Sequence, residues 1–148
     1  MAQTPILRAA CEADFPAIRA LIRQVGINPT GLAWQRFWVA VDEEGRLAGC
    51  GQVKPHRDGT RELASIAVVP EWRGQGVAST IIQRLIVEHP GRLYLTCRAS
   101  MGTYYERFGF RKVAEDELTP YFRRIQRLVG FFMRVGMAEE GLLVMVRG

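Results

Sequence analysis

The sequence predicts a mixed α/β sheet. Strand patterns alternate with helical patterns only in the middle of the chain, whereas a doubly wound fold would alternate throughout. The clearest unit begins with a β-branched apolar stretch at residues 64–69, passes through a turn with Gly74 and Gly76, and continues from Ala78 as an apolar repeat of helical spacing. The 148 residues are 48% hydrophobic, which is enough for one sizeable core. We therefore expect a single domain over residues 1–148.

The N-terminal half is expected to supply three strands and one helix. Strand-like apolar segments lie at residues 6–10, 34–41 and 46–53. The turn at residues 42–45 joins the last two and is typical of a hairpin. A helix should start after Asp14, with Pro16 in its first turn, and end at Gly26. Aromatic residues in a strand lie more often in the core than in the lining of a substrate cleft. We therefore expect core positions for Trp34, Phe37 and Trp38.

The rest of the chain should add four strands, which makes about seven in a mostly antiparallel sheet. These strand patterns lie at residues 61–69, 93–97, 110–114 and 141–146, and a short helix should carry Tyr104 and Tyr105. Thr119 and Pro120 are typical of the start of a helix, which we expect over residues 121–135 as an extra element inserted before the last strand. Its apolar face is formed by Tyr121, Phe122, Ile125, Leu128, Val129, Phe132 and Met133. We expect this face to pack on the domain's own core, although a basic amphipathic helix can also lie on a membrane or bind nucleic acid.

Composition narrows the classes of protein to which this chain can belong. The chain lacks a long apolar run and a signal-peptide pattern, so we expect a cytoplasmic protein without a membrane span. Cys11, Cys50 and Cys97 are odd in number and far apart, which indicates small buried residues rather than disulfides or a zinc site. The net charge of +5 is compatible with nucleic acid, anionic lipid or a polyphosphate cofactor and does not choose among them.

The turn after residues 64–69 is a candidate phosphate site. Glycines let backbone N–H groups at a helix N-terminus approach a ligand, and the helix dipole favours negative charge there. A dinucleotide-binding fold is disfavoured because Ser79 stands where its third glycine would be and no acidic residue ends a strand about twenty residues later. A P-loop is excluded because the sequence has no Gly-Lys-Ser or Gly-Lys-Thr.

Two motifs in order resemble the GNAT superfamily of N-acetyltransferases. Arg73-x-x-Gly76-x-Ala78, preceded by an apolar strand that ends at Pro70, is similar to the acyl-CoA signature of that family. The segment Tyr104-Tyr105-Glu106-Arg107-Phe108-Gly109-Phe110 resembles its aromatic-Tyr-Glu-x-x-Gly-Phe element. The resemblance covers residues 62–113. It implies a GNAT-like acyltransferase fold, acetyl-CoA as co-substrate without a metal, and direct transfer of the acetyl group to a primary amine in a ternary complex.

The resemblance also implies how the cofactor is held. The strand before the turn would pair with the pantetheine arm, a backbone amide near Val68 would face the thioester oxygen, and the amides of residues 74–79 would hold the pyrophosphate. The implied cofactor-binding residues are Ile66, Ala67, Val68, Arg73, Gly74, Gln75, Gly76, Val77, Ala78 and Ser79.

The same resemblance suggests two catalytic residues. Tyr105 occupies the position of a tyrosine that protonates the departing thiolate, and a phenol of pKa about 10 can donate to a sulfur whose thiol pKa is about 8–9. Glu62, eleven residues before Arg73, lies where lysine-acetylating members carry a general base, although a solvated carboxylate at the start of a strand is the alternative. His56 is a weaker candidate base, favoured as a solvated loop residue. Arg98 replaces an Asn that touches the cofactor in many members, and its role stays open.

Other functions are also compatible with the sequence. A GNAT-fold module could bind acyl-CoA as a sensor or partner-binding protein without catalysis, and the arginine-bearing helix could bind nucleic acid, which we do not expect. The acceptor could be a small molecule, a peptide N-terminus or a lysine, and a homodimer is compatible with the sequence.

Overall fold

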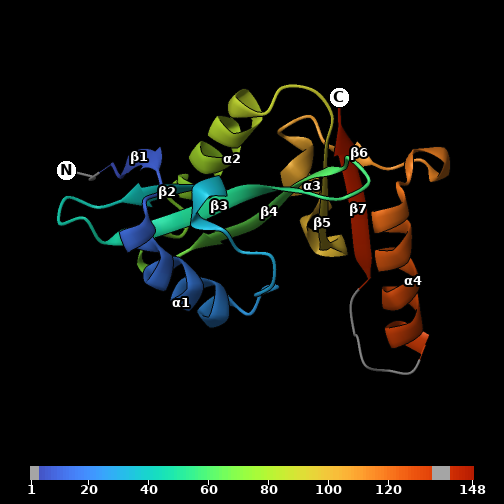
Figure 1. Ribbon diagram of the computed structural model, residues 1–148, viewed down its shortest axis with the longest axis horizontal. Coiled ribbons are helices and arrows are strands. Elements are labelled where there is room, and N and C mark those ends of the chain that lie inside the picture. Colours follow the sequence, from blue (N-terminus) through green and yellow to red (C-terminus); the bar gives the residue numbers. More distant parts are fainter. Residues whose placement is uncertain (1–3, 135–140) are drawn as a thin grey trace. The chain divides into compact units, whose positions relative to one another are not determined.

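The computed structural model describes residues 4–134 and 141–148 (Figure 1). Its strands are β1 (Ile6–Ala9), β2 (Phe37–Val41), β3 (Leu47–Pro55), β4 (Arg61–Val68), β5 (Leu93–Arg98), β6 (Arg111–Lys112) and β7 (Leu142–Arg147). Its α-helices are α1 (Phe15–Val25), α2 (Val77–Glu88), α3 (Gly102–Glu106) and α4 (Pro120–Arg134). Single 3-10 turns are η1 (Glu12–Asp14), η2 (Trp34–Arg36), η3 (Pro70–Trp72), η4 (Ala99–Met101) and η5 (Glu115–Glu117).

The strands form a mixed and mostly antiparallel sheet, as the sequence predicts. They are hydrogen-bonded in the order β1-β2-β3-β4-β5-β7-β6. The β4 and β5 strands are parallel, with Glu62 paired to Tyr94, whereas β1 with β2, β2 with β3, and β7 with both β5 and β6 are antiparallel. The chain divides into two compact units, which are described separately. The first comprises Met1–Lys54 and Leu63–Pro90, and the second Pro55–Glu62 and Gly91–Gly148.

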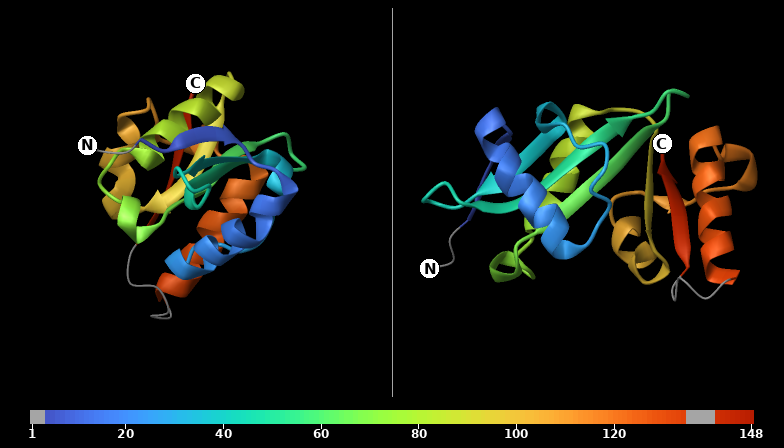
Figure 2. Two further views of the ribbon diagram at one scale, coloured as in Figure 1. Left: turned by 90° about the vertical axis from the view of Figure 1, so that its left-hand side faces the viewer. Right: turned by 60° about the horizontal axis from the view of Figure 1, so that its bottom comes forward.

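In the first unit, α1 and α2 cover opposite faces of the strands (Figures 1 and 2). The core beneath α1 contains Ile18, Leu21, Ile22, Phe37, Val39, Val41, Cys50 and Ala67. On the other face, Gly49 and Gly51 let α2 approach closely. A Cβ at Gly51 would lie 2.5 Å from Ile66 Cδ1 and 2.8 Å from Ile81 Cγ2. Glycine is therefore required at this point of β3 by packing rather than by backbone conformation.

The predicted start and end of α1 are confirmed. Asp14 precedes the helix, and its carboxylate accepts hydrogen bonds from Arg8 and from the backbone amide of Cys11. Gly26 ends the helix in the left-handed conformation, with φ of 75°. The predicted strand over 34–41 starts later than expected, because Trp34 lies in η2 and β2 begins only at Phe37.

In the second unit, α3 and α4 lie on opposite faces of β5 and β7. Tyr94 and Phe122 stack with ring centroids 5.3 Å apart and form a cluster with Val144 and Val146 beneath α4. The predicted packing of the apolar face of α4 on the core is confirmed at the N-terminal end of the helix only. Leu128 is 50% exposed and Met133 44% exposed, so the apolar face is not fully covered. The side chain of Phe132 and all of Val135 lie outside the described part of the chain.

The cysteine prediction holds for two of the three residues. Cys50 and Cys97 are buried, whereas Cys11 is exposed beside η1. Within the described ranges, no three His, Cys, Asp or Glu side chains are grouped so as to hold a metal ion. Every helix in those ranges falls short of the length and hydrophobicity that a membrane span requires.

Candidate active site

The turn from β4 to α2 forms a cradle in the first unit. The chain leaves β4 with the amide of Val69 bonded to the carbonyl of Ala48, then makes the turn η3. Gly74 and Gly76 follow with φ of 75° and 82°, a conformation that side-chain-bearing residues rarely adopt. A Cβ at either glycine would meet nothing within 4 Å. The glycines are therefore needed for the backbone conformation, and the space beside them is open.

Helix α2 begins directly at this cradle. Its first backward hydrogen bonds run from the amide of Thr80 to the carbonyl of Gly76, at 3.1 Å, and from the Thr80 hydroxyl to the same oxygen. The amides of Val77 and Ala78 precede that bond, so the helix supplies them with no acceptor. Arg73 and Gln75 are exposed on the same turn. Amide donors, the positive end of a helix dipole and an arginine together suit an anionic group such as a phosphate.

A bend in β4 lies just before the predicted pantetheine-binding residues. Ser65 has φ of 61°, and it is the one non-glycine residue with positive φ in the described ranges. Its hydroxyl accepts a 2.8 Å hydrogen bond from Gln52 Nε2, and its carbonyl accepts a contact from the Cys50 thiol at 3.6 Å. Strained residues of this kind persist where neighbours hold them. Sequence reasoning missed Ser65, because nothing in an Ala-Ser-Ile strand pattern signals a left-handed residue.

In the second unit, Glu62 is enclosed rather than solvated. The residue is only 7% exposed, and its Oε1 lies 2.8 Å from Nε2 of His56. The ring of Tyr121 stacks on the ring of His56, with centroids 3.6 Å apart. The alternatives of a solvated carboxylate at Glu62 and a solvated loop histidine at His56 are therefore wrong, since each side chain covers the other.

Tyr105 lies on α3 in the same unit. Its ring makes edge contacts with Tyr104, at 5.2 Å between centroids, and with Phe110, at 6.3 Å. Burial, followed by the nearby Cys97 and Tyr104, raises the pKa of the Tyr105 phenol to about 12. The phenol is therefore protonated throughout the ordinary pH range, so it can donate a hydrogen bond or a proton and cannot act as a general base.

Glu62 and Tyr105 lie on opposite faces of β5. Glu62 pairs with Tyr94, whose ring faces α4, whereas Tyr105 is near Cys97, three residues further along the strand. Because successive side chains of a strand alternate between faces, positions 94 and 97 point to opposite sides. The structure thus brings together residues 66–68 and 73–79 as one continuous segment of the first unit, and places the two catalytic candidates on either side of a strand in the second. Arg98 is exposed at the end of β5.

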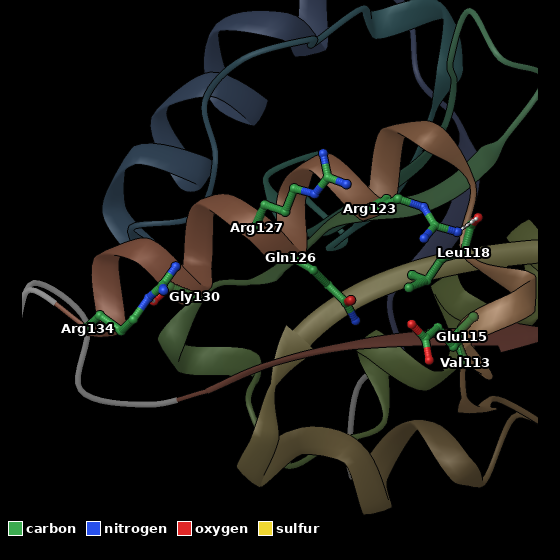
Figure 3. A pocket seen from close by; sticks show the side chains of 8 residues that line it. All are labelled: Val113, Glu115, Leu118, Arg123, Gln126, Arg127, Gly130 and Arg134. Atoms are coloured by element: carbon green, nitrogen blue, oxygen red, sulfur yellow. Dashed lines mark hydrogen bonds between the residues drawn. The ribbon is translucent and has the colours of Figure 1, made fainter.

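A separate hollow lies along α4 in the second unit (Figure 3). Its volume is about 590 Å³, and it is lined by Val113, Glu115, Leu118, Arg123, Gln126, Arg127, Gly130 and Arg134. Arg123 donates a long hydrogen bond of 3.5 Å to the carbonyl of Leu118, and Arg134 donates to that of Gly130. None of the predicted site residues lines this hollow.

Comparisons with known proteins agree with this architecture. A family model described as an acetyltransferase (GNAT) domain matches residues 33–112, which are more than half of the chain. The amino-acid acetyltransferase of Mycobacterium tuberculosis is 30% identical over 92 residues, which cover 55% of this chain and 53% of that protein. The chain thus spans about half the length of that relative.

Solved structures share the fold across nearly the whole chain. N-acetylglutamate synthase from Neisseria gonorrhoeae, complexed with coenzyme A and N-acetyl-glutamate, has a TM-score of 0.72 at 23% identity, over 99% of this chain and 35% of its own. Rv2747 from Mycobacterium tuberculosis, in complex with CoA, has a TM-score of 0.71 at 23% identity, over 97% of this chain and 98% of its own. Escherichia coli ElaA gives 0.69 at 15% identity, over 97% and 99%. With the family match and the strand order, these likenesses show that the chain belongs to the GNAT acetyltransferase family.

Proposed function

We propose that the protein is an acetyl-CoA-dependent N-acetyltransferase whose acceptor is the amine of a free α-amino acid. The observation that carries the proposal is the double-glycine turn at the N-terminus of α2, inside a matched GNAT domain. The relatives support the acceptor class, since one is named an amino-acid acetyltransferase and another was solved with N-acetyl-glutamate. A peptide N-terminus or a lysine is the alternative acceptor.

The cofactor would be held by residues of the first unit. Amides of the turn and of the first residues of α2 would bind the pyrophosphate, with Arg73 adding positive charge. Backbone groups of Ile66, Ala67 and Val68 would pair with the pantetheine arm. When bound, the thioester of acetyl-CoA supplies the acetyl group, and a backbone amide near Val68 would stabilise the oxyanion.

Tyr105 would assist the leaving thiolate by donating a hydrogen bond. With a phenol pKa of about 12, full proton transfer to a thiolate whose conjugate acid has a pKa of about 8–9 is uphill. The donor therefore stabilises the charge that develops on sulfur, and the proton itself is delivered by solvent. Glu62 lies on the opposite face of β5 from Tyr105, so it would act on the amine rather than on the leaving group. It would accept the proton that the amine must lose before it attacks, directly or through water.

The test is acetyl transfer to a panel of amines. The protein is incubated with acetyl-CoA and α-amino acids, a lysine peptide or a peptide with a free N-terminus, and the acetylated product is measured by mass spectrometry. Mass detection is preferred over a thiol reagent because the exposed Cys11 would react with the reagent. Product with an amino acid, at a higher kcat/KM than with either peptide, is the expected result.

A sensor that binds acyl-CoA without catalysis is the rival function. It predicts CoA binding without product from any amine, and function unaffected by Glu62→Gln. In both readings Gly76→Ala should weaken CoA binding about tenfold, because alanine rarely adopts a φ of 82° and the turn would have to change its backbone conformation. Gly45→Ala is the matched control, since Gly45 also has φ of 80° and open space but lies in the β2–β3 hairpin.

A further inference from the structure

Glu62 makes a buried contact that its proposed role does not require. A carboxylate that is only 7% exposed needs hydrogen-bond partners, because burying a polar group without them costs free energy. His56 Nε2 supplies one donor to Oε1 at 2.8 Å. This bond fixes the plane of the carboxylate and so the direction of its remaining lone pairs.

His56 is itself held by the first turn of α4. The Tyr121 ring lies nearly parallel to the imidazole, at an interplanar angle of 18°, and Phe122 meets the imidazole edge-on at 6.3 Å. The backbone amide of Tyr121 donates to Asp58 Oδ2 at 3.0 Å, which ties the start of α4 to the β3–β4 hairpin. Phe122 is fully buried and stacks on Tyr94, the residue that pairs with Glu62 across the sheet.

We infer that His56 and Tyr121 are positioning residues for Glu62, so that the start of α4 prepares the general base of the transferase. The inference rests on the proposed function. It assigns a role to the first turn of a helix whose purpose the sequence left open. Tyr121 blocks one face of the imidazole and so prevents the His56 ring from turning away from the carboxylate.

The charges around this cluster fit the assignment. The groups that face His56 are Glu62 from β4, Asp58 from the hairpin and Tyr121 from α4, and Arg124 lies near Tyr121. Hydrogen bonds from Thr60 and from the amide of Tyr121 lower the pKa of Asp58 to about 2, so Asp58 is ionised at any working pH. Burial first, and then the charge of Glu62 and a hydrogen bond to it, raise the pKa of Tyr121, which therefore stays protonated as a donor.

The experiment compares His56→Leu, His56→Gln and Tyr121→Leu in the full chain. We expect His56→Leu and Tyr121→Leu to lower kcat about tenfold with the KM for acetyl-CoA unchanged, because neither residue is among those proposed to hold the cofactor. His56→Gln retains an N–H donor and should restore most of the activity.

Two controls make the result specific. His89→Gln removes the other histidine of the chain, at the end of α2, and should leave kcat unchanged. In a proton NMR spectrum, Tyr121→Leu should shift the His56 ring resonances, because the His56 ring lies against the Tyr121 ring.

The inference is overturned if the wild type is active and both leucine variants keep its kcat, or if Glu62→Gln is as active as the wild type. Either result leaves the acetyltransferase proposal intact. A wild type that acetylates no amine refutes the proposed function instead, and with it the role given to Glu62.

Discussion

At the scale of single residues, Tyr105 allows a prediction about pH. Its pKa of about 12 lies above the ordinary value of about 10, so the folded state favours the protonated phenol. Any contribution of this group to stability is therefore complete below about pH 10 and is lost as pH rises towards 12. The pH profile of the activity should likewise show no alkaline limb due to Tyr105 in the working range.

Replacing Tyr105 by Phe should lower kcat about a hundredfold while the affinity for CoA changes little. The ring contacts with Tyr104 and Phe110 are retained, so only the hydroxyl is lost. Initial rates and CoA binding by calorimetry measure the two effects separately. Equal turnover would show that the phenol does not assist the leaving thiolate, and a large loss of CoA affinity would make it a binding residue instead.

The residues of the candidate site differ in how far sequence could identify them. Gly74 and Gly76 were identifiable because left-handed backbone needs glycine almost regardless of context. Ser65 was not, because a serine adopts that conformation only when partners such as Gln52 hold it. The burial of Glu62 by His56 and Tyr121 was also missed, since these residues come together only when the chain folds.

At the scale of elements, two glycine substitutions should have opposite effects on stability. Gly51→Ala in β3 should cost about 1–3 kcal/mol in the free energy of unfolding, because its Cβ would lie 2.5 Å from Ile66 Cδ1 beneath α2. Gly130→Ala in α4 should stabilise by up to about 1 kcal/mol, because its Cβ meets nothing within 4 Å and alanine favours a helix. Urea unfolding of both variants measures the difference. A stabilised Gly51→Ala would mean that α2 can move away without cost.

Element ends were predicted well where capping chemistry marks them and poorly where it does not. Pro120 and Gly26 bound α4 and α1 as expected. Residues 34–36 were expected in a strand because aromatic residues suit strands, yet they form η2 before β2 begins. The strand expected at 110–114 is reduced to Arg111 and Lys112, because Val113 already bonds to β7 outside the regular ladder and η5 follows.

The whole molecule carries a net charge of +5, and two of its basic sites compete for an anionic cofactor. One is the glycine turn with Arg73, and the other is the hollow with Arg123, Arg127 and Arg134 (Figure 3). The turn offers backbone amides at a helix N-terminus, which hold a phosphate by directed hydrogen bonds. Exposed arginines instead attract it through their charge, and salt at 0.1 M limits the reach of that attraction to about 10 Å.

We therefore expect CoA to stabilise the fold mainly through the turn. At a hundred times its Kd, CoA should add about 2.7 kcal/mol to the free energy of unfolding, and raising the salt should weaken the binding without abolishing it. Hydrogen exchange with CoA bound should slow at residues 66–80. The triple change of Arg123, Arg127 and Arg134 to Gln should leave this protection in place. Protection that appears along α4 instead, and disappears with the arginines or with salt, would move the cofactor site from the turn to the hollow.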